Sequence, residues 1–385
     1  MAHLMCIFGT RPEAIKLAPV IMALRRRNIE VRVVVTGQHP DLVPRILEGF
    51  GIAADMALPS GIDPNARIAA LQRAIREAAP GAVIVQGDTA STVAGAVAAG
   101  LEGVPLVYVE AGLRTYDIAR PFPEELYRRA VTRLAQLHFA PTVKAHGHLL
   151  REGVARAQIH LVGNTVVDAL RHMLPPPDAA PPLPLRDERR LVIMTAHRFE
   201  TSGPPMRGIF QAAARLSEDE GLDVWFLTHP RLADDERAFL PPGHRVRLAP
   251  PLNYPDFLWC LRHAALVVTD SGGIQEEAAV LGTPIACIRD CTERPEILDQ
   301  PFARLVGTQP ARIVAAAHDL LAMTPAETGS QAFGDGHAAA RIADILARPN
   351  FFAAVNQLPV VTPRLPFVND DPSDEEDNAH VRLSP

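Results

Sequence analysis

Apolar runs recur along the chain, and each is followed by a polar or glycine-containing loop and then by a longer helical pattern. β-Branched runs without polar alternation are typical of strands buried on both faces of a parallel sheet. Strands that alternate with helices form a doubly wound sheet, and this pattern occurs once in each half of the chain. It predicts an α/β protein with two Rossmann-like domains facing a central cleft. We expect strands at 4–8, 30–36, 82–86, 106–109, 191–195, 224–228, 246–248, 266–269 and 285–288.

The proline-rich stretch 175–184 holds few residues that favour helix or strand, so we interpret it as a linker. A last helix is expected near 338–346, where it packs back across the domains. The acidic run 370–377 predicts a mobile tail. The predicted divisions are an N-terminal domain over 1–172, a linker over 173–187, a C-terminal domain over 188–347 and a tail over 348–385.

The stretch 264–296 carries the strongest local signal. A predicted strand runs into the sequence Asp-Ser-Gly-Gly at 270–273 and then into a helix near 274–281. The free amides and the dipole at the start of such a helix favour an anion such as phosphate. Glu276 and Glu277 follow one turn later, where a carboxylate could accept hydrogen bonds from sugar hydroxyls. A lone Ser-Gly-Gly is equally typical of an ordinary βαβ unit, so other motifs have to decide.

Polar residues follow the first-domain strands. Arg11, His39, Asp88 and Glu110 each come shortly after a strand end. In parallel sheets the ligand crevice lies beyond the carboxyl ends of the strands, so these residues are expected along one edge. One such acid is usually a helix cap, but several acids and bases at one edge indicate a reaction site. Glu124 adds a carboxylate in the first turn of another helix, where the dipole also favours it on structural grounds.

The second half repeats this arrangement. His197 follows the strand at 191–195, and the loop 251–257 is rich in aromatic residues. Its Phe257 could stack on a flat base. These features fit a nucleotide held by the second domain and a carried group held by the first.

Composition narrows the partners. The 385-residue chain has a net charge of −6, which makes nucleic acid an unfavourable partner. No apolar run approaches the roughly 20 residues that span a bilayer, so we expect no membrane association. The four cysteines have no metal-ligand spacing, and the chain enters a strand too early for a signal peptide. We therefore predict a cytoplasmic protein with reduced thiols.

In order and spacing, the assembled motifs resemble the bacterial UDP-N-acetylglucosamine 2-epimerases, which have the two-domain glycosyltransferase-B fold. The resemblance covers about residues 8–346. It rests on Gly-Thr-Arg-Pro-Glu at 9–13, Gly-Asp-Thr at 87–89, Glu-Ala-Gly-Leu-Arg-Thr at 110–115, Pro-Glu-Glu at 123–125, Gly-Asn-Thr at 163–165, His-Arg at 197–198, Thr-Asp-Ser-Gly-Gly-Ile-Gln-Glu-Glu at 269–277 and Thr-Glu-Arg-Pro-Glu at 292–296.

The resemblance implies a reaction. UDP-GlcNAc would lose its C2 proton and its UDP by anti elimination, which leaves 2-acetamidoglucal and UDP. Re-addition of UDP, with the proton returned to the other face, would give UDP-ManNAc. The resemblance implies no metal and no cofactor, and it implies a homodimer.

It also implies site residues. The family's acids match Asp88, Glu110 and Glu124, and its histidine near the phosphates matches His197. Residues needed for catalysis match Arg11 and Lys16, to which we assign charge stabilisation. The UDP-binding positions, with Phe257 added from its aromatic loop, are Ser271, Gly272, Gly273, Glu277 and Arg294.

Three departures from the family pattern bear on substrate and regulation. Tyr127 stands where an asparagine is usual, and Phe199 replaces an arginine after the His-Arg pair. Pro40 and Asp41 follow Gln-His in a helix where bacterial members bind a second UDP-GlcNAc as activator. The alternatives are a hydrolysing epimerase that releases ManNAc and UDP, an epimerase of a related UDP-sugar, a glycosyltransferase on the same fold, and a sugar-nucleotide sensor without catalysis.

Overall fold

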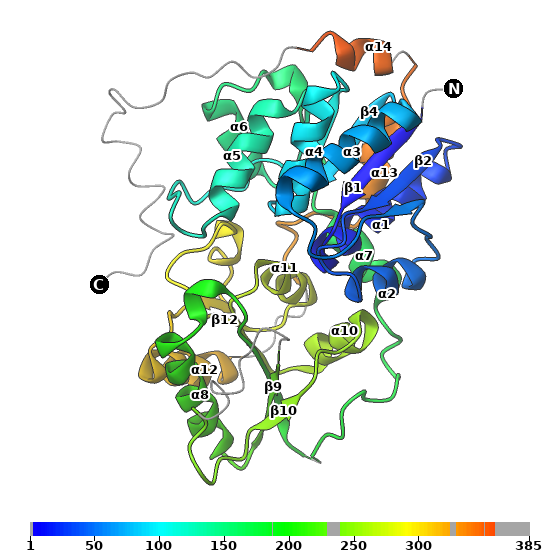
Figure 1. Ribbon diagram of the computed structural model, residues 1–385. Coiled ribbons are helices and arrows are strands. Elements are labelled where there is room, and N and C mark those ends of the chain that lie inside the picture. The colour runs from blue at the N-terminus through cyan, green and yellow to red at the C-terminus, as the bar shows by residue number, and fades with distance from the viewer. Residues whose placement is uncertain (1–2, 187, 229–238, 324–328, 350, 359–385) are drawn as a thin grey trace, which may run out of the picture. The chain divides into compact units, whose positions relative to one another are not determined.

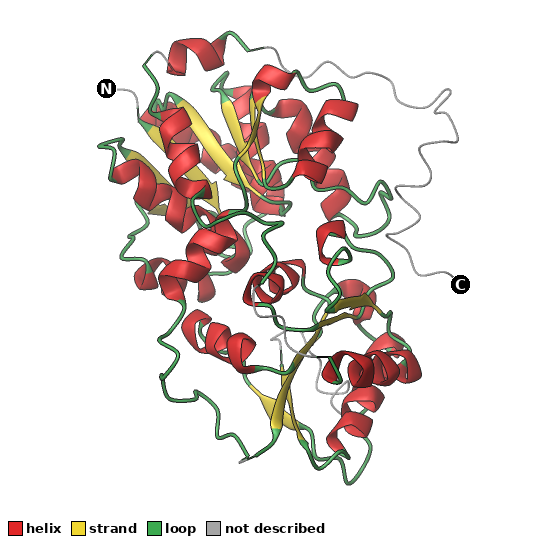
Figure 2. Cartoon of the chain, turned by 180° about the vertical axis from the view of Figure 1, so that it is seen from behind, coloured by secondary structure: helices red, strands yellow, loops and turns green. Residues whose placement is uncertain are grey.

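The computed structural model forms two compact units. The first runs from the N-terminus to His172 and resumes at Phe333, and the second runs from Met173 to Ala332. Each unit has one parallel sheet with helices packed around it (Figure 2). The predicted α/β class with two parallel sheets is confirmed. The residues described are 3–186, 188–228, 239–323, 329–349 and 351–358.

The first sheet has seven parallel strands in the order β3-β2-β1-β4-β5-β6-β7. They are β1 (Leu4–Phe8), β2 (Val31–Val35), β3 (Met56–Ala57), β4 (Ala82–Gln86), β5 (Leu106–Val109), β6 (Leu137–Ala140) and β7 (Ile159–Leu161). The helices of this unit are α1 (Arg11–Arg25), α2 (Leu42–Gly49), α3 (Pro64–Ala78), α4 (Ala90–Leu101), α5 (Glu124–Leu134), α6 (Val143–Arg151), α7 (Thr165–Met173), α13 (Ala338–Leu346) and α14 (Phe351–Asn356), together with the 3-10 turn η1 (Arg156–Gln158).

The second sheet has six parallel strands in the order β10-β9-β8-β11-β12-β13. They are β8 (Arg190–Thr195), β9 (Leu222–Leu227), β10 (Arg247–Ala249), β11 (Leu266–Thr269), β12 (Ile285–Cys287) and β13 (Ala303–Leu305). The helices are α8 (Pro204–Ser217), α10 (Tyr254–His263), α11 (Gly272–Leu281) and α12 (Pro310–Leu321), with the 3-10 turns η2 (Phe199–Thr201) and η3 (Pro295–Ile297).

Both sheets have the Rossmann strand order, which places a topological switch point in each. The chain winds outward in one direction from β1 and in the other from β4, and the same holds for β8 and β11. Loops that leave neighbouring strands at a switch point diverge to opposite faces of the sheet and open a crevice at its carboxyl edge. The residues after β1 and β4, and those after β8 and β11, therefore lie where such sheets bind ligands.

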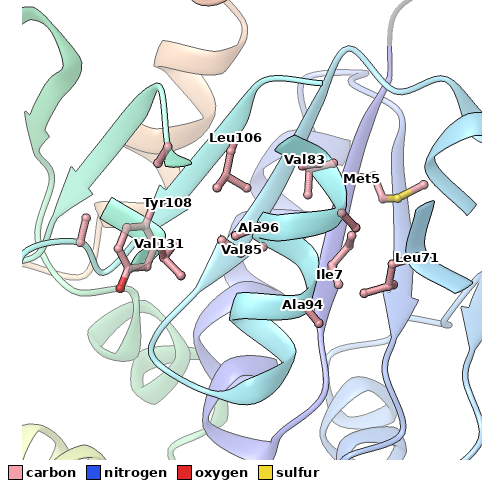
Figure 3. Packing of buried hydrophobic residues seen from close by; sticks show 14 of the residues in the cluster. Met5, Ile7, Leu71, Val83, Val85, Ala94, Ala96, Leu106, Tyr108 and Val131 are labelled. Carbon is pink, nitrogen blue, oxygen red and sulfur yellow. The ribbon is translucent and has the colours of Figure 1, made fainter. Parts of the chain in front are cut away.

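The core of the first unit is aliphatic and lies between the sheet and its helices. Figure 3 shows this packing, with residues of β1, β4 and β5 against α3, α4 and α5. Tyr108 is fully buried in it, and its hydroxyl donates to the backbone oxygen of Gly87 over 2.8 Å. That bond ties the core to the loop after β4. A second apolar cluster, which includes Phe210 and Phe226, fills the corresponding space around β8 and α8.

Helix α13 belongs to the first unit, although the sequence analysis counted it with the second domain while expecting it to pack back. It lies beside α1 (orange and blue in Figure 1). Arg27 donates to Asp344 over 2.7 Å and to the backbone oxygen of Ala340 over 3.2 Å. Asp168 of α7 accepts from two N–H groups at the start of α13.

Helix α14 lies within 348–385, the range in which the sequence predicts a tail. Phe351 and Val355 are both buried, and their spacing of four residues places them on one face of the helix. Those two apolar residues are too few to give a periodic signal. The acidic run 370–377 lies outside the described residues. Within the described ranges, no helix is long and apolar enough to cross a membrane.

The pKa values of two buried histidines predict how the stability of the first unit changes as the pH falls. Burial lowers the pKa of His138 and of His148 to about 4, although each ring has a backbone carbonyl neighbour, at 3.1 Å from His138 and 2.9 Å from His148. In the unfolded chain a histidine has a pKa of about 6.5. Between about pH 6.5 and pH 4 the unfolded state therefore binds protons that the folded state does not bind, and the free energy of unfolding falls as the pH falls.

We expect the free energy of unfolding to drop by up to about 1.4 kcal/mol per pH unit for each histidine in that window, and these two residues to contribute no pH dependence above it. Urea unfolding followed by circular dichroism at pH 7.5 and pH 5.0 measures the drop. His148→Gln should reduce it, whereas replacement of the exposed His244 by Gln should not. If the free energy of unfolding of His148→Gln drops between pH 7.5 and pH 5.0 as much as that of wild type, His148 does not contribute to the pH dependence.

Candidate active site

Glu110 follows β5 and has three donors within the first unit. Its backbone φ is 63°, in the left-handed region that non-glycine residues rarely adopt and that is concentrated at functional sites. The side chain is 5% exposed and forms an ion pair with Lys16 of α1. Asn164 donates to Oε1 over 3.0 Å, and Gln86 donates to Oε2. Because a carboxylate only accepts, these donors hold Glu110 in one orientation.

A buried glutamate fixes the start of α1 and thus the place of its lysine. Glu13 Oε2 accepts the N–H groups of Gly9 and Thr10 over 2.9 and 2.8 Å. Its Oε1 accepts the hydroxyls of Thr89 and Thr92 over 2.6 and 2.7 Å. Burial raises the pKa of Glu13, and these four hydrogen bonds oppose the rise. The loops after β1 and β4 are thereby joined through one side chain.

Asp88 and Glu125 share one buried arginine. Arg128 of α5 contacts Asp88 Oδ2 twice, over 2.8 Å from Nε and 2.6 Å from Nη2. Its Nη1 donates to Glu125 Oε2 over 3.0 Å. The side chains of Arg128 and Glu125 are 1% and 0% exposed, whereas that of Asp88 is 25% exposed. Of these two carboxylates, Asp88 is therefore the one that solvent reaches.

Arg11 and Glu124 are the first residues of α1 and α5. The N–H of Arg11 donates to Nδ1 of His39 over 3.3 Å, which joins the loops after β1 and β2. Glu124 lies in the first turn of its helix, where a negative charge is favourable. Both side chains are half-buried. That Arg11 or Glu124 takes part in the reaction remains a prediction.

In the second unit, Asp270 joins the loops after β8 and β11. Its Oδ2 accepts the N–H groups of His197 and Arg198 over 2.8 and 2.9 Å and the hydroxyl of Thr201 over 2.6 Å. Its Oδ1 lies 3.2 Å from His197 Nδ1. Burial alone would raise the pKa of Asp270, but His197 and the other donors lower it well below the usual range. Asp270 is therefore a buried carboxylate that keeps its charge.

Ser271, Gly272 and Gly273 form the start of α11. Ser271 is the N-cap residue, and its N–H donates to the hydroxyl of Thr269 over 3.0 Å. The N–H groups of a first helical turn have no partner within the helix and suit an anion. A Cβ at Gly272 would lie 2.1 Å from Nη1 of Arg294, whereas one at Gly273 would meet nothing within 4 Å. Gly272 is thus required by the arginine packed against it.

Arg294 is part of a chain of alternating charges that is buried except at its end, Glu200. Its Nε donates to Glu276 over 2.6 Å, and its Nη1 pairs with Glu293. Glu293 in turn accepts from Arg289 over 2.6 Å, and Arg289 reaches Glu200 over 2.7 Å. Burial would lower the pKa of Arg289, but these carboxylates raise it well above its usual value. Glu276, expected from the sequence to accept hydrogen bonds from sugar hydroxyls, is paired with Arg294 instead.

Glu277 and Phe257 lie on facing helices of the second unit. Glu277 Oε1 accepts the hydroxyl of Tyr254 over 2.9 Å. Phe257 is 6% exposed within α10, so the loop predicted over 251–257 is wrong in its second half. Asn253 caps that helix by accepting the N–H of residue 256 over 2.9 Å, which is the signal that the loop reading overlooked.

Sequence reasoning nominated both a partly exposed residue such as Asp88 and buried residues such as Lys16 and Glu110, but it missed several of their buried partners. Some of those partners carried a local signal, since they end or follow a buried strand. Others lie on helices whose inner face only the tertiary packing defines. The missed residues are Gln86, Arg128, Asn164, Asp270, Arg289 and Glu293.

Gly272 and Gly273 give a matched test of the packing at α11. Gly272→Ala forces Arg294 away from the carboxylates that hold it, so we expect a loss of about 1–3 kcal/mol in the free energy of unfolding. Gly273→Ala adds a methyl group in open space and should be neutral or stabilising by up to about 1 kcal/mol. Urea unfolding of both variants measures the difference. Equal stabilities would show that Arg294 does not depend on Gly272.

Comparison with known proteins places this geometry in a family. A family model described as UDP-N-acetylglucosamine 2-epimerase matches residues 22–347. The UDP-N-acetylglucosamine 2-epimerase of Escherichia coli (strain K12) is 38% identical in an alignment of 367 positions, which covers 88% of this chain and 97% of that protein.

Solved structures agree with the sequence comparison. The S. aureus MnaA–UDP co-structure is 34% identical, with a TM-score of 0.84 over 94% of this chain and 100% of that chain. The UDP-GlcNAc 2-epimerase from Neisseria meningitidis bound to UDP-GlcNAc is 32% identical, with a TM-score of 0.81 over 90% and 99%. The family resemblance found in the motifs is confirmed. This chain belongs to the UDP-N-acetylglucosamine 2-epimerase family.

Proposed function

We propose that this protein is a non-hydrolysing UDP-N-acetylglucosamine 2-epimerase that interconverts UDP-GlcNAc and UDP-ManNAc. The observation that carries the proposal is a pair of carboxylate–cation contacts at the loops after β4 and β5, Arg128 with Asp88 and Lys16 with Glu110, in a member of this family. In the proposed reaction a base takes the C2 proton, and the C1–O bond breaks with its electron pair leaving on UDP. UDP then adds back to 2-acetamidoglucal while a proton returns to C2 from the other face.

The carboxylates of the first unit suggest a division of labour. Asp88 is the more exposed, and both arginine contacts fall on its Oδ2, so we assign it proton exchange with the sugar. Glu110 is already occupied by its three donors and holds Lys16 in place. Charge stabilisation would then come from Arg11 and Lys16 of α1. A further acid would come from Glu124 at the start of α5.

The second unit would hold UDP. The N–H groups at the start of α11, at Ser271–Gly273, suit the diphosphate, and Arg294 adds a cation that is kept in place by its carboxylates. We assign the ribose hydroxyls to Glu277 and base stacking to Phe257. His197, at the neighbouring strand end, would meet the phosphates.

Asp88→Asn tests the assignment of the base. We expect turnover of UDP-GlcNAc to fall on the order of 10²–10⁴-fold, because an amide cannot take the C2 proton. UDP affinity, measured by calorimetry, should stay within about threefold, since the proposed UDP residues are elsewhere in the chain. Glu110→Gln should also lower turnover and leave UDP affinity unchanged, because it removes the negative charge that holds Lys16 in place. Glu102→Gln at the far end of α4 is the matched control. Full activity in either variant would remove that residue from the mechanism.

The products decide between the proposal and its alternatives. Wild-type protein incubated with UDP-GlcNAc should build up UDP-ManNAc, visible as a new anomeric signal by NMR. Free ManNAc together with UDP would instead indicate the hydrolysing reaction. Release of UDP only after an acceptor is added would indicate a glycosyltransferase. Unchanged UDP-GlcNAc under every condition would overturn the proposal.

We also propose a cytoplasmic homodimer. In the first unit Leu101, Phe122 and Val143 are 64%, 63% and 73% exposed, and a second copy would cover such apolar side chains. The four cysteines are buried free thiols, and burial raises the pKa of Cys6, Cys260 and Cys287 to about 12. Thiols of that kind are unreactive and suit a reducing compartment.

A further inference from the structure

We propose that Asp270 is a positioning residue that determines which ring nitrogen of His197 carries the proton, and so makes Nε2 the nitrogen that exchanges a proton or hydrogen bond with the ligand's diphosphate. The role of the ligand rests on the proposed function, whereas the proton placement rests on the geometry of the second unit alone.

Strand register brings the two residues together. Strands β8 and β11 are paired neighbours, with Thr195 opposite Thr269, and the hydroxyls of these threonines lie 2.8 Å apart. His197 comes two residues after one threonine, and Asp270 comes directly after the other. The carboxylate therefore accepts from the backbone of the adjacent loop at the switch point, and the His197 side chain, which is 31% exposed, lies beside it.

The two carboxylate oxygens of Asp270 have separate tasks. Oδ2 accepts three donors, which are the N–H groups of His197 and Arg198 and the hydroxyl of Thr201. Oδ1 is buried without a hydrogen-bond partner among the described residues, and His197 Nδ1 lies 3.2 Å from it, within ion-pair distance. An ionised carboxylate offers only acceptor positions, so the imidazole can satisfy Oδ1 only with a hydrogen on Nδ1. In a neutral imidazole Nε2 then has the lone pair, and it is the site at which the ring gains or loses a proton.

The charged neighbours of this pair leave that assignment unchanged. The Nε of Arg198 donates to the backbone oxygen of Asp270 over 3.0 Å, so this arginine is bound to the same loop. Its Nη2 lies 3.5 Å from Glu293, which is itself paired with Arg289 and Arg294. Of these groups, Asp270 provides the carboxylate that lies 3.2 Å from Nδ1 of the imidazole.

Asp270→Asn should move the ring hydrogen of His197 from Nδ1 to Nε2 and still provide an oxygen for the three donors that now bind Oδ2. The three donors at Oδ2 require an oxygen, so the amide must turn its NH₂ group toward Nδ1. That nitrogen then has to accept, and the ring hydrogen moves to Nε2. The matched control is Thr201→Val, which removes a buried donor from the same carboxylate and leaves the contact with the ring intact.

The test uses ¹⁵N-histidine-labelled full-length protein, with the His197 signal assigned by its loss in His197→Gln. We expect wild type and Thr201→Val to show a protonated Nδ1, and Asp270→Asn to show a protonated Nε2. Turnover of UDP-GlcNAc should fall on the order of 10²-fold in Asp270→Asn, with UDP affinity by calorimetry changed less than about fivefold. Thr201→Val should keep turnover within about fivefold of wild type.

Two results would overturn the inference. One is an Asp270→Asn protein that keeps the wild-type tautomer. The other is a Thr201→Val protein that loses as much turnover as Asp270→Asn while its tautomer is unchanged, since that pattern means a structural role only. If wild type does not convert UDP-GlcNAc at all, the proposed function fails, and the ¹⁵N measurement still decides the role of Asp270.

Discussion

A buried carboxylate at the switch point of each sheet is the interaction on which both polar clusters depend. A loop that leaves a parallel strand has N–H groups with no ladder partner, and leaving such a group buried and unpaired costs about 1–3 kcal/mol. Glu13 in the first unit and Asp270 in the second each accept two successive N–H groups of such a loop, and each also accepts side-chain hydroxyls. Glu13 accepts the N–H groups of its own loop after β1 and two hydroxyls from the β4 side, whereas Asp270, after β11, accepts all three donors from the β8 side. These bonds also fix the positions of Lys16, on the helix that Glu13 caps, and of His197, in the loop that Asp270 binds.

Charge compensation explains the buried arginines. Arg128 lies between Asp88 and Glu125, and Arg294 lies between Glu276 and Glu293. Breaking a buried pair leaves an uncompensated charge at a cost of about 3–5 kcal/mol, so such side chains occur in alternating sets. A set of this kind holds each member in one geometry before any ligand arrives. Preorganised charge is the property that a reaction with developing negative charge on a leaving group requires.

The fold could be predicted closely because both sheets are parallel and fully covered. Strands buried on both faces read as uninterrupted apolar runs, and β1, β4, β5 and β11 have the bounds that the runs predict. Elements with a weak apolar signal were not predicted. Examples are α14, which has two buried residues, and the start of α10, where Asn253 acts as a cap. These depend on contacts with distant parts of the chain or on a single capping bond. Neither produces periodicity.

By itself the sequence determined which polar residues follow strand ends, and hence that Asp88, Glu110 and His197 lie at the carboxyl edges of two sheets. It did so because chain direction and strand order leave those residues no other place. Only the tertiary structure decided which partners hold them, as with Arg128 on Asp88 and Asp270 on His197. Those pairs join elements 40 and 73 residues apart in the chain. Strand register and helix packing select such pairs, and no local pattern of residue types encodes them.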